Sequence, residues 1–326
     1  MKYDVVIIGG GPIGLNCAIE AKKAGLSYVV LEKGVLVNSL YNFPTNMTFF
    51  STSNLLEIGG VPFIAHNDKP TRREALEYFR RVQESWELDI KLYTEVKSMS
   101  HNGEVYQVLT TKGTFEAENV VVATGFYDTA RKLNIPGEDL KKVKHFYDDP
   151  HPYVDQKVLV IGAANSACDV ALETFYKGAE VTMAIRESEI YPKVKYWIRP
   201  NIENRIKEGS IQAYFNTTVK EIRPHEVVLE TPEEEVTLEN DFVLAMTGYM
   251  PNYQLFESLG IPVSDDEHKI PIHNEDTLET PLPGVYVAGV INSGMQTSKL
   301  FIENTRVHSE MIAKSILSKK RSEVSA

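Results

Sequence analysis

The spacing of apolar residues in the first part of the chain predicts a strand, a helix and a second strand. The apolar run 3–8 is rich in Val and Ile, the pattern over 15–24 is helical, and a second apolar run covers 28–31. Short β-branched runs are typical of buried parallel strands, and a helix between two of them makes a β-α-β unit. The chain therefore opens as half of a Rossmann-like fold.

The same order of elements returns once, in the middle of the chain. Residues 157–161 are apolar and β-branched, 168–176 are helical in pattern, and 180–185 form another apolar run. In both units a turn of small residues joins the first strand to the helix. This repetition predicts a second nucleotide-binding domain.

Further strands indicate how the two domains are connected. VVVAT at 120–124 and FVLAMT at 242–247 each precede a glycine, and a strand at 285–287 is followed by an amphipathic helix at about 299–318. We therefore predict an α/β fold of two Rossmann-like (FAD/NAD(P)-binding), three-layer domains, with the second inserted in the first. The expected bounds are 1–125 and 243–326 for a discontinuous FAD-binding domain and 126–242 for an NADPH-binding domain.

The first turn carries the pattern G-x-G-x-x-G as Gly9, Gly11 and Gly14, and the next strand ends on Glu32. In such a motif the glycines allow a tight turn, close approach of a pyrophosphate, and close packing of helix on sheet. Phosphates are favoured at the helix N-terminus by unpaired N–H groups and the helix dipole. An acid at the position of Glu32 accepts from ribose hydroxyls and repels a 2′-phosphate, so this site favours FAD or NAD.

The second turn is a variant of the same motif, with Gly162, Ala164 and Ala167 at the three positions. The next strand ends on Arg186, where an arginine accommodates the 2′-phosphate of NADPH. The second site therefore favours NADPH over NADH. The residues that open its helix and can donate to a pyrophosphate are Asn165 and Ser166.

Composition and charge narrow the possible functions. Hydrophobic residues make up 43% of the chain and charged residues 24%, which indicates a globular protein, and the net charge of -11 opposes binding to nucleic acid. The chain has neither the roughly 20-residue apolar run of a membrane-spanning helix nor a signal-peptide pattern, so we expect a cytoplasmic protein without a membrane partner. The two cysteines, Cys17 and Cys168, have no His or Cys at metal-ligand spacing, so we expect no metal site and no disulfide framework.

Several local strings resemble one family of flavoproteins. Together with ATG at 123–125 and TGY at 247–249, they make the chain similar to the bacillithiol-disulfide (bacilliredoxin) reductase family, among the thioredoxin-reductase-like two-dinucleotide-binding-domain flavoproteins. The C-x-x-C of thioredoxin reductases is missing, because 145–156 reads HFYDDPHPYVDQ. The strings that carry the resemblance are GGGPIGLNCAIE at 9–20, YNFPTNMTFFSTS at 41–53, VPFI at 61–64, DDPHPYVDQKVLVIGAANSACD at 148–169, AGVINSG at 288–294 and FIEN at 301–304.

The resemblance implies a homodimeric oxidoreductase that passes hydride from NADPH to FAD and then reduces a low-molecular-weight thiol disulfide or a small redox protein of the bacilliredoxin type. From the motifs and the resemblance together, the expected FAD-binding residues are Gly9, Gly11, Pro12, Gly14, Glu32, Lys33, Asn46, Thr48, Val96, Ala123, Thr124, Gly125, Gly289 and Val290. The expected NADPH-binding residues are Gly162, Ala164, Asn165, Ser166, Arg186 and Gly248.

The sequence departs from that family at its proposed redox thiol. The first motif of the family reads GGGPCG, whereas this chain has Ile13 in place of the cysteine, and isoleucine cannot form a mixed disulfide. Cys17 lies one helical turn further on, where the helix N-terminus would favour a thiolate. The competing interpretation is that Cys17 is a small buried residue packing helix on sheet. We therefore assign no catalytic residue.

Alternative functions remain open on the sequence. A ferredoxin or flavodoxin–NADP reductase of the thioredoxin-reductase type needs no protein thiol, which suits Ile13. A flavin monooxygenase would need an oxygen-reactive pocket, and its usual signature F-x-G-x-x-x-H is absent between the two units. A non-catalytic redox sensor would use bound nucleotide only to set a conformation.

Overall fold

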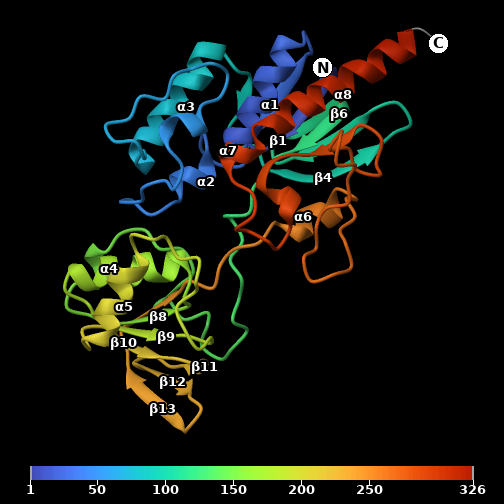
Figure 1. The fold of residues 1–326 in the computed structure, drawn as a ribbon. Coiled ribbons are helices and arrows are strands. Elements are labelled where there is room, and N and C mark those ends of the chain that lie inside the picture. The colour runs from blue at the N-terminus through green and yellow to red at the C-terminus, as the bar shows by residue number, and fades with distance from the viewer. Residues whose placement is uncertain (1, 325–326) are drawn as a thin grey trace. The chain divides into compact units, whose positions relative to one another are not determined.

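The computed structural model describes residues 2–324, which form two compact units (Figure 1). The larger unit is built from both ends of the chain, Met1–Thr129 and Tyr249–Ala326, and the smaller unit is Ala130–Gly248. Both chain crossings come a few residues later than the sequence suggested. The second comes later because β14 (Phe242–Ala245) pairs in parallel with β8 (Lys157–Ile161), inside the smaller unit.

The larger unit is built on a seven-stranded sheet with strand order β3-β2-β1-β6-β5-β4, in which β15 also pairs with β6. The C-terminal half of β6 lies parallel to β1 and β15, while its N-terminal half lies antiparallel to β5. The parallel part is the Rossmann-like sheet that the sequence predicted. The strands are β1 (Lys2–Ile8), β2 (Tyr28–Leu31), β3 (Ile90–Lys91), β4 (Val96–His101), β5 (Tyr106–Thr110), β6 (Gly113–Val122) and β15 (Val285–Val287).

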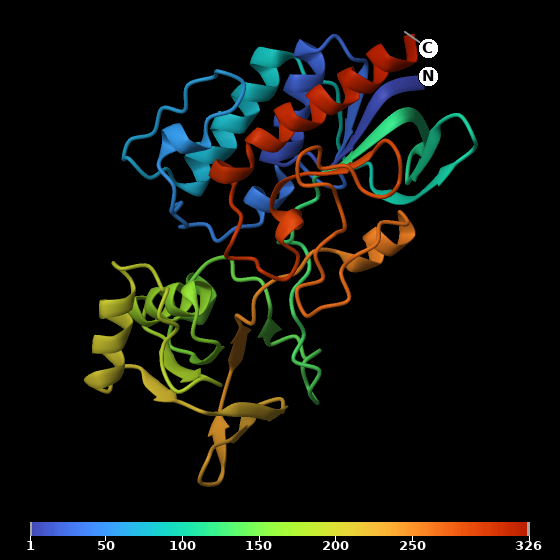
Figure 2. The ribbon, with the colours of Figure 1, turned by 45° about the vertical axis from the view of Figure 1, so that its right-hand side comes forward.

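Alternate residues of β1 supply two separate cores, one on each face of this sheet. Val5 and Ile7 pack with α1, α3 and α8, whereas Val6 and Ile8 pack with β4, β5 and α6. Side chains of a strand alternate between faces, so a fully apolar strand buries both of them. Figure 2 shows α8 lying alongside α1 over one face. The helices are α1 (Pro12–Lys23), α2 (Asn38–Tyr41), η1 (Ser53–Leu56), α3 (Arg72–Trp86), α6 (Tyr253–Ser258), η3 (Gly289–Ser293), α7 (Ile302–Thr305) and α8 (Val307–Val324).

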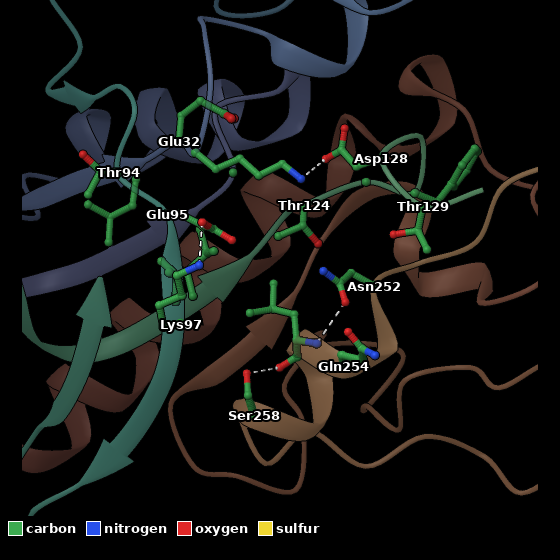
Figure 3. Close-up of a pocket in the computed structure, with 18 residues that line it drawn as sticks. Glu32, Thr94, Glu95, Lys97, Thr124, Asp128, Thr129, Asn252, Gln254 and Ser258 are labelled. Carbon is green, nitrogen blue, oxygen red and sulfur yellow. Dashed lines mark hydrogen bonds and ion pairs between the residues drawn. The ribbon is translucent and has the colours of Figure 1, made fainter. Parts of the chain in front are cut away.

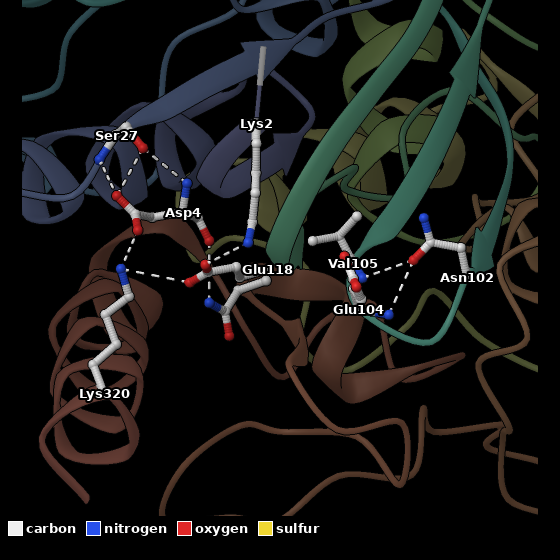
Figure 4. Close-up of polar contacts among 9 residues, drawn as sticks. Lys2, Asp4, Ser27, Asn102, Glu104, Val105, Glu118 and Lys320 are labelled. Carbon is white, nitrogen blue, oxygen red and sulfur yellow. Dashed lines mark hydrogen bonds and ion pairs between the residues drawn. The ribbon is translucent and has the colours of Figure 1, made fainter. Parts of the chain in front are cut away.

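Ion pairs attach the end of α8 to the sheet (Figure 4). Lys320 pairs with Asp4 of β1 and lies 3.5 Å from Glu118 of β6. Asp4 also accepts from the backbone N–H of Ser27 over 2.7 Å, and Lys2 pairs with Glu118 at 2.9 Å. These contacts join the first strand of the unit to its last helix.

The smaller unit has a five-stranded parallel sheet with the order β10-β9-β8-β14-β7, and a separate antiparallel sheet of three strands. Its core is formed by β8, β9 and the helix between them, packed against α5. This unit therefore has its own Rossmann-like centre. Its remaining elements are β7 (Val143–Lys144), η2 (His151–Tyr153), α4 (Asn165–Tyr176), β9 (Glu180–Ala184), α5 (Arg199–Lys207), β10 (Gln212–Tyr214), β11 (Thr218–Ile222), β12 (Glu226–Glu230) and β13 (Glu235–Glu239).

Helix starts are where the sequence prediction was least accurate. Helices α1 and α4 both begin three residues before the predicted starts at 15 and 168, because Pro12 and Asn165 open first turns that carry no apolar periodicity. The predicted final helix is two helices, α7 and α8, and it runs on to Val324. Among the described residues, no helix combines the length and the apolarity that crossing a membrane requires.

Candidate functional site

Three glycines shape the turn between β1 and α1, each in a different way. A Cβ on Gly14 would lie 1.9 Å from the carbonyl oxygen of Gly9, so α1 can pack this closely only with glycine there. Gly9 has φ +107°, and a Cβ on it would lie 2.6 Å from the carbonyl oxygen of Ala123. A Cβ on Gly11 would meet nothing within 4 Å. Space is therefore left open at the one glycine that should face a pyrophosphate.

The start of α1 is suited to an anion. Gly11 is the N-cap residue and makes no side-chain cap, Pro12 occupies the first turn, and that turn contains no acidic residue. The first N–H groups of a helix lack partners within the helix and carry its positive dipole end. These groups are therefore available to a phosphate.

Glu32 closes the site at the end of β2. Its side chain is buried, with 5% of its surface exposed, and it accepts from the N–H of Gly10 over 2.7 Å and of Gly34 over 2.9 Å. Burial raises the pKa of Glu32, while these two hydrogen bonds act in the opposite direction. Each carboxylate oxygen can still accept a further hydrogen bond, so the residue can receive ribose hydroxyls.

A pocket of about 230 Å³ in the larger unit opens beside Glu32 (Figure 3). Helix α6 forms the side opposite Glu32, through Asn252, Gln254 and Ser258. Lys33 borders the pocket and pairs with Asp128 at 2.9 Å. The residues predicted to bind FAD that line the pocket are Gly9, Glu32, Lys33, Val96, Thr124 and Gly125.

The hydroxyl group of Thr124 indicates whether this pocket fits a nucleotide. Its hydroxyl oxygen is buried and, among the described residues, has no hydrogen-bond partner. An unsatisfied buried hydroxyl costs free energy unless a ligand or water completes it. With the buried acid Glu32 and the open space at Gly11, this hydroxyl fits the polar atoms of an adenosine diphosphate.

The other residues predicted for FAD lie outside the pocket. Ala123 follows β6 and is buried against the glycine turn. Asn46 and Thr48 lie between α2 and η1, away from the pocket lining. Gly289 and Val290 open η3.

The second turn, between β8 and α4, repeats this construction in the smaller unit. Gly162 has φ +123°, and a Cβ on it would lie 2.8 Å from the carbonyl oxygen of Met246. Ala164 is the N-cap residue of α4 and makes no side-chain cap, and Ser166 is exposed. The Oδ1 of Asn165 accepts from the N–H of Lys195 over 2.9 Å, which leaves the N–H groups of its side-chain amide as donors. The helix N–H groups, Ser166 and the amide of Asn165 can therefore donate to a ligand.

Arg186 follows β9, the strand parallel to β8, and its side chain is 79% exposed. Within residues 2–324 it pairs with its neighbour Glu187 alone, at 2.8 Å, and such exposed pairs are weak. The nearby cations are held more firmly, since Lys195 pairs with Asp169 at 3.0 Å and Arg199 with Glu203 at 2.6 Å. Arg186 is thus more able to turn to a ligand than Lys195 or Arg199.

Gly248 lies two residues after Met246, whose carbonyl oxygen borders the second turn. It is the last residue of the smaller unit, with φ +91°, and its carbonyl accepts from the N–H of Arg131 over 3.0 Å. The hydroxyl of Thr247 donates to the carbonyl of Arg131 over 2.6 Å. These two bonds pair the incoming and outgoing segments of the smaller unit.

Both cysteines are buried. The thiol of Cys17 in α1 donates to the hydroxyl of Ser309 in α8 over 3.4 Å, and that of Cys168 in α4 donates to the carbonyl of Ala163 over 3.6 Å. Burial raises the pKa of both thiols to about 12. Ile13 is buried as well. The geometry therefore favours a packing role for Cys17 over a redox role, and no metal-binding cluster of three or more His, Cys, Asp or Glu is present within residues 2–324.

Some pocket residues were missed by sequence reasoning. Asn252 caps α6 by accepting from the N–H of Leu255 over 3.0 Å, and the preceding Pro251 with this Asn is a helix-start signal that could have been read. The approach of α6 to β2 and β4 carries no local signal. It depends on the fold of the whole unit.

Comparisons with known proteins agree with this geometry. The family described as pyridine nucleotide-disulphide oxidoreductase matches residues 6–289. The bacilliredoxin reductase Bdr of Bacillus subtilis (strain 168) is 43% identical over 97% of this chain and 98% of its own length. Two solved structures have TM-scores of 0.95. The bacillithiol disulfide reductase Bdr from Bacillus cereus is 43% identical and covers 98% of this chain and 100% of its own, and that from Staphylococcus aureus is 41% identical with 98% and 99% covered.

These matches extend over almost the whole chain and include both glycine turns. The chain therefore belongs to the pyridine nucleotide-disulphide oxidoreductases, a family of oxidoreductase enzymes, within the group of bacillithiol disulfide (bacilliredoxin) reductases.

Proposed function

We propose that the chain is an NADPH-dependent, FAD-containing oxidoreductase that reduces a low-molecular-weight thiol disulfide or a bacilliredoxin-type protein disulfide. The observation that carries this proposal is the pair of glycine turns with opposite charges beside them. The turn in the larger unit ends at the buried Glu32, and the turn in the smaller unit ends at the exposed Arg186. We assign FAD to the larger unit and NADPH to the smaller.

In the larger unit, each feature of the site has a separate task. The N–H groups at the start of α1 bind the pyrophosphate, Glu32 accepts from the ribose, and Thr124 supplies a hydroxyl to the adenosine end. When bound, FAD supplies the two-electron chemistry, and the chain supplies binding and orientation.

In the smaller unit, the 2′-phosphate is the group that distinguishes NADPH from NADH. Arg186 can release Glu187 and form a charge-assisted bond to this phosphate. The pyrophosphate is bound by the N–H groups of α4, by Ser166 and by the side-chain amide of Asn165. The bond from Lys195 to Oδ1 of Asn165 orients this amide and leaves its N–H groups as donors.

A disulfide acceptor is supported by the names of the relatives. The chain itself adds a restriction, because Ile13 replaces the family cysteine and both thiols are buried with raised pKa values. Electrons would therefore reach the disulfide without a protein thiol as relay. The same restriction favours a second candidate, a ferredoxin or flavodoxin–NADP reductase, which requires no thiol.

The test begins with the visible absorbance of the purified protein, which should show bound FAD. NADPH consumption is then measured in parallel with bacillithiol disulfide, a bacilliredoxin disulfide, ferredoxin and oxygen. Turnover only with ferredoxin would favour the second candidate, and a chain unable to bind FAD would refute both.

The coenzyme assignment is tested with Arg186→Ala. We expect the KM for NADPH to rise about 10- to 100-fold, the effect of losing about 1.4 to 2.8 kcal/mol, with little change for NADH. Arg223→Ala is the matched control, because Arg223 is another solvent-accessible arginine of the smaller unit and pairs with Glu221 and Glu226. Equal preference for the two coenzymes before and after the Arg186 change would contradict the assignment.

A further inference from the structure

His308, in the first turn of α8, bonds to the backbone of a turn that sequence reasoning assigned to FAD. The N–H of Gly289 donates to Nδ1 of His308 over 3.1 Å. Nδ1 can accept only when it carries no proton, so this bond requires a neutral ring protonated at Nε2. The bond joins the last helix of the larger unit to the turn after β15.

Gly289 is held from its other side by α1. It has φ +85°, and a Cβ on it would lie 3.3 Å from the side chain of Ile13. Two further bonds hold α1 and α8 together here, from Asn16 to the carbonyl of Arg306 over 2.9 Å and from Cys17 to Ser309 over 3.4 Å. The turn at Gly289 is therefore fixed between the helix that follows the first glycine motif and the start of α8.

The surroundings of His308 keep its ring neutral. Burial and repulsion from His273 lower its pKa to about 4. The positive end of the α8 dipole acts in the same direction. Two titratable groups next to this bond are already engaged: the thiol of Cys17 donates to Ser309, and the guanidinium of Arg306 donates to the carbonyl of Glu57 over 2.7 Å. His273 in turn has its Nδ1 committed to the carbonyl of Pro271.

We propose that His308 is a positioning residue for the flavin, which holds Gly289 in place beside the first glycine turn and so helps to shape the flavin cradle. The inference rests on the proposed FAD site and adds His308 to the residues that determine the affinity of this site for FAD. It also gives that affinity a lower pH limit, because protonation of Nδ1 removes the acceptor for Gly289.

Two substitutions of His308 distinguish the effect of losing the hydrogen-bond acceptor from the effect of losing the imidazole ring. His308→Leu removes the acceptor, whereas His308→Asn places Oδ1 close to the position of Nδ1 and does not titrate. We expect the FAD dissociation constant of the Leu variant to rise about tenfold, which corresponds to about 1.4 kcal/mol, and that of the Asn variant to stay within about threefold of the unsubstituted protein. His225→Leu, at an exposed histidine of the smaller unit, is the matched control and should change nothing.

The measurements are quenching of FAD fluorescence on titration into the flavin-free protein, from about pH 7 to about pH 3.5 so that the range spans the pKa of His308 at about 4, and hydrogen–deuterium exchange of the peptide containing Gly289. Affinity should fall with pH in the unsubstituted protein and stay level in the Asn variant. The proposal is overturned if the Leu variant binds FAD as tightly as the unsubstituted protein, or if the Asn variant is as weak as the Leu variant.

Two further readouts keep the test decisive. If the Leu variant does not fold, the pH profile of the Asn variant decides, and a profile like that of the unsubstituted protein refutes the proposal. A chain that binds no FAD would refute the proposed function alone. In that case, unchanged exchange at Gly289 in the Leu variant would still refute the hold on this turn.

Discussion

The two glycines that flank the start of α1 allow a sharp test of how the first turn works, because Ala should fail at each for a different reason. At Gly14, a methyl group would lie 1.9 Å from the carbonyl oxygen of Gly9, where real contacts stay above 3.0 Å. The backbone at Gly9 or Gly14 would have to move by more than about 1 Å. Overpacking of this kind lowers the free energy of unfolding by about 3 kcal/mol. We expect Gly14→Ala to unfold at a lower urea concentration even without FAD, with a Tm lower by about 6–12 °C.

Gly11→Ala should leave the fold almost intact and remove the cofactor. Gly11 has φ −75° and ψ 178°, which alanine adopts freely, and a Cβ there meets nothing within 4 Å. The fold should lose at most about 1 kcal/mol, the cost of a poorer N-cap residue. The new methyl group would occupy the approach of the pyrophosphate, so the FAD dissociation constant should rise at least about 100-fold. Unchanged FAD binding by Gly11→Ala, measured by fluorescence titration, would refute the assignment of this turn to FAD.

Three further outcomes follow from the same structure. Neither Cys17 nor Cys168 should react with a disulfide reagent such as DTNB in the native protein, and both should react in denaturant, because burial raises the pKa of each thiol to about 12. Lys320→Met should lower the free energy of unfolding by at most about 1 kcal/mol, and by less in high salt, because its pairs with Asp4 and Glu118 are partly exposed. The free energy of unfolding should fall as pH drops from about 6.5 toward 4, because His308 binds a proton in the unfolded chain in this range but stays neutral in the folded protein. The midpoint of urea unfolding should therefore depend less on pH in His308→Asn than in the unsubstituted protein.

The parts of the fold that could be predicted from sequence are those encoded by short-range patterns. Strand β8 has the predicted bounds, and both β-α-β units form as expected, since apolar β-branched runs and glycine turns are local features. The starts of α1 and α4 were placed late because Pro12 and Asn165 open first turns without apolar periodicity. The break between α7 and α8 at Arg306 also has no counterpart in the apolar pattern.

The candidate site divides in the same way. Residues next to a motif, such as Glu32 and Thr124, were found because their role follows from their position after a strand. Asn252 and His308 were missed, since each reaches the site from an element that is remote in sequence. Their approach is decided by tertiary packing, and a single sequence without an alignment contains no signal for it.

Ile13 shows why a motif and its surroundings have to be considered together. In the sequence, it only removes a thiol from a position where the family has one. In the structure, its buried side chain packs against Gly289, whose N–H is bonded to His308, so an apolar side chain here also supports the turn at Gly289. At this position the chain therefore has a packing contact where the family has a thiol. Without that thiol, an acceptor cannot be bound through exchange with a cysteine here, so we expect the acceptor to be selected by its access to the flavin.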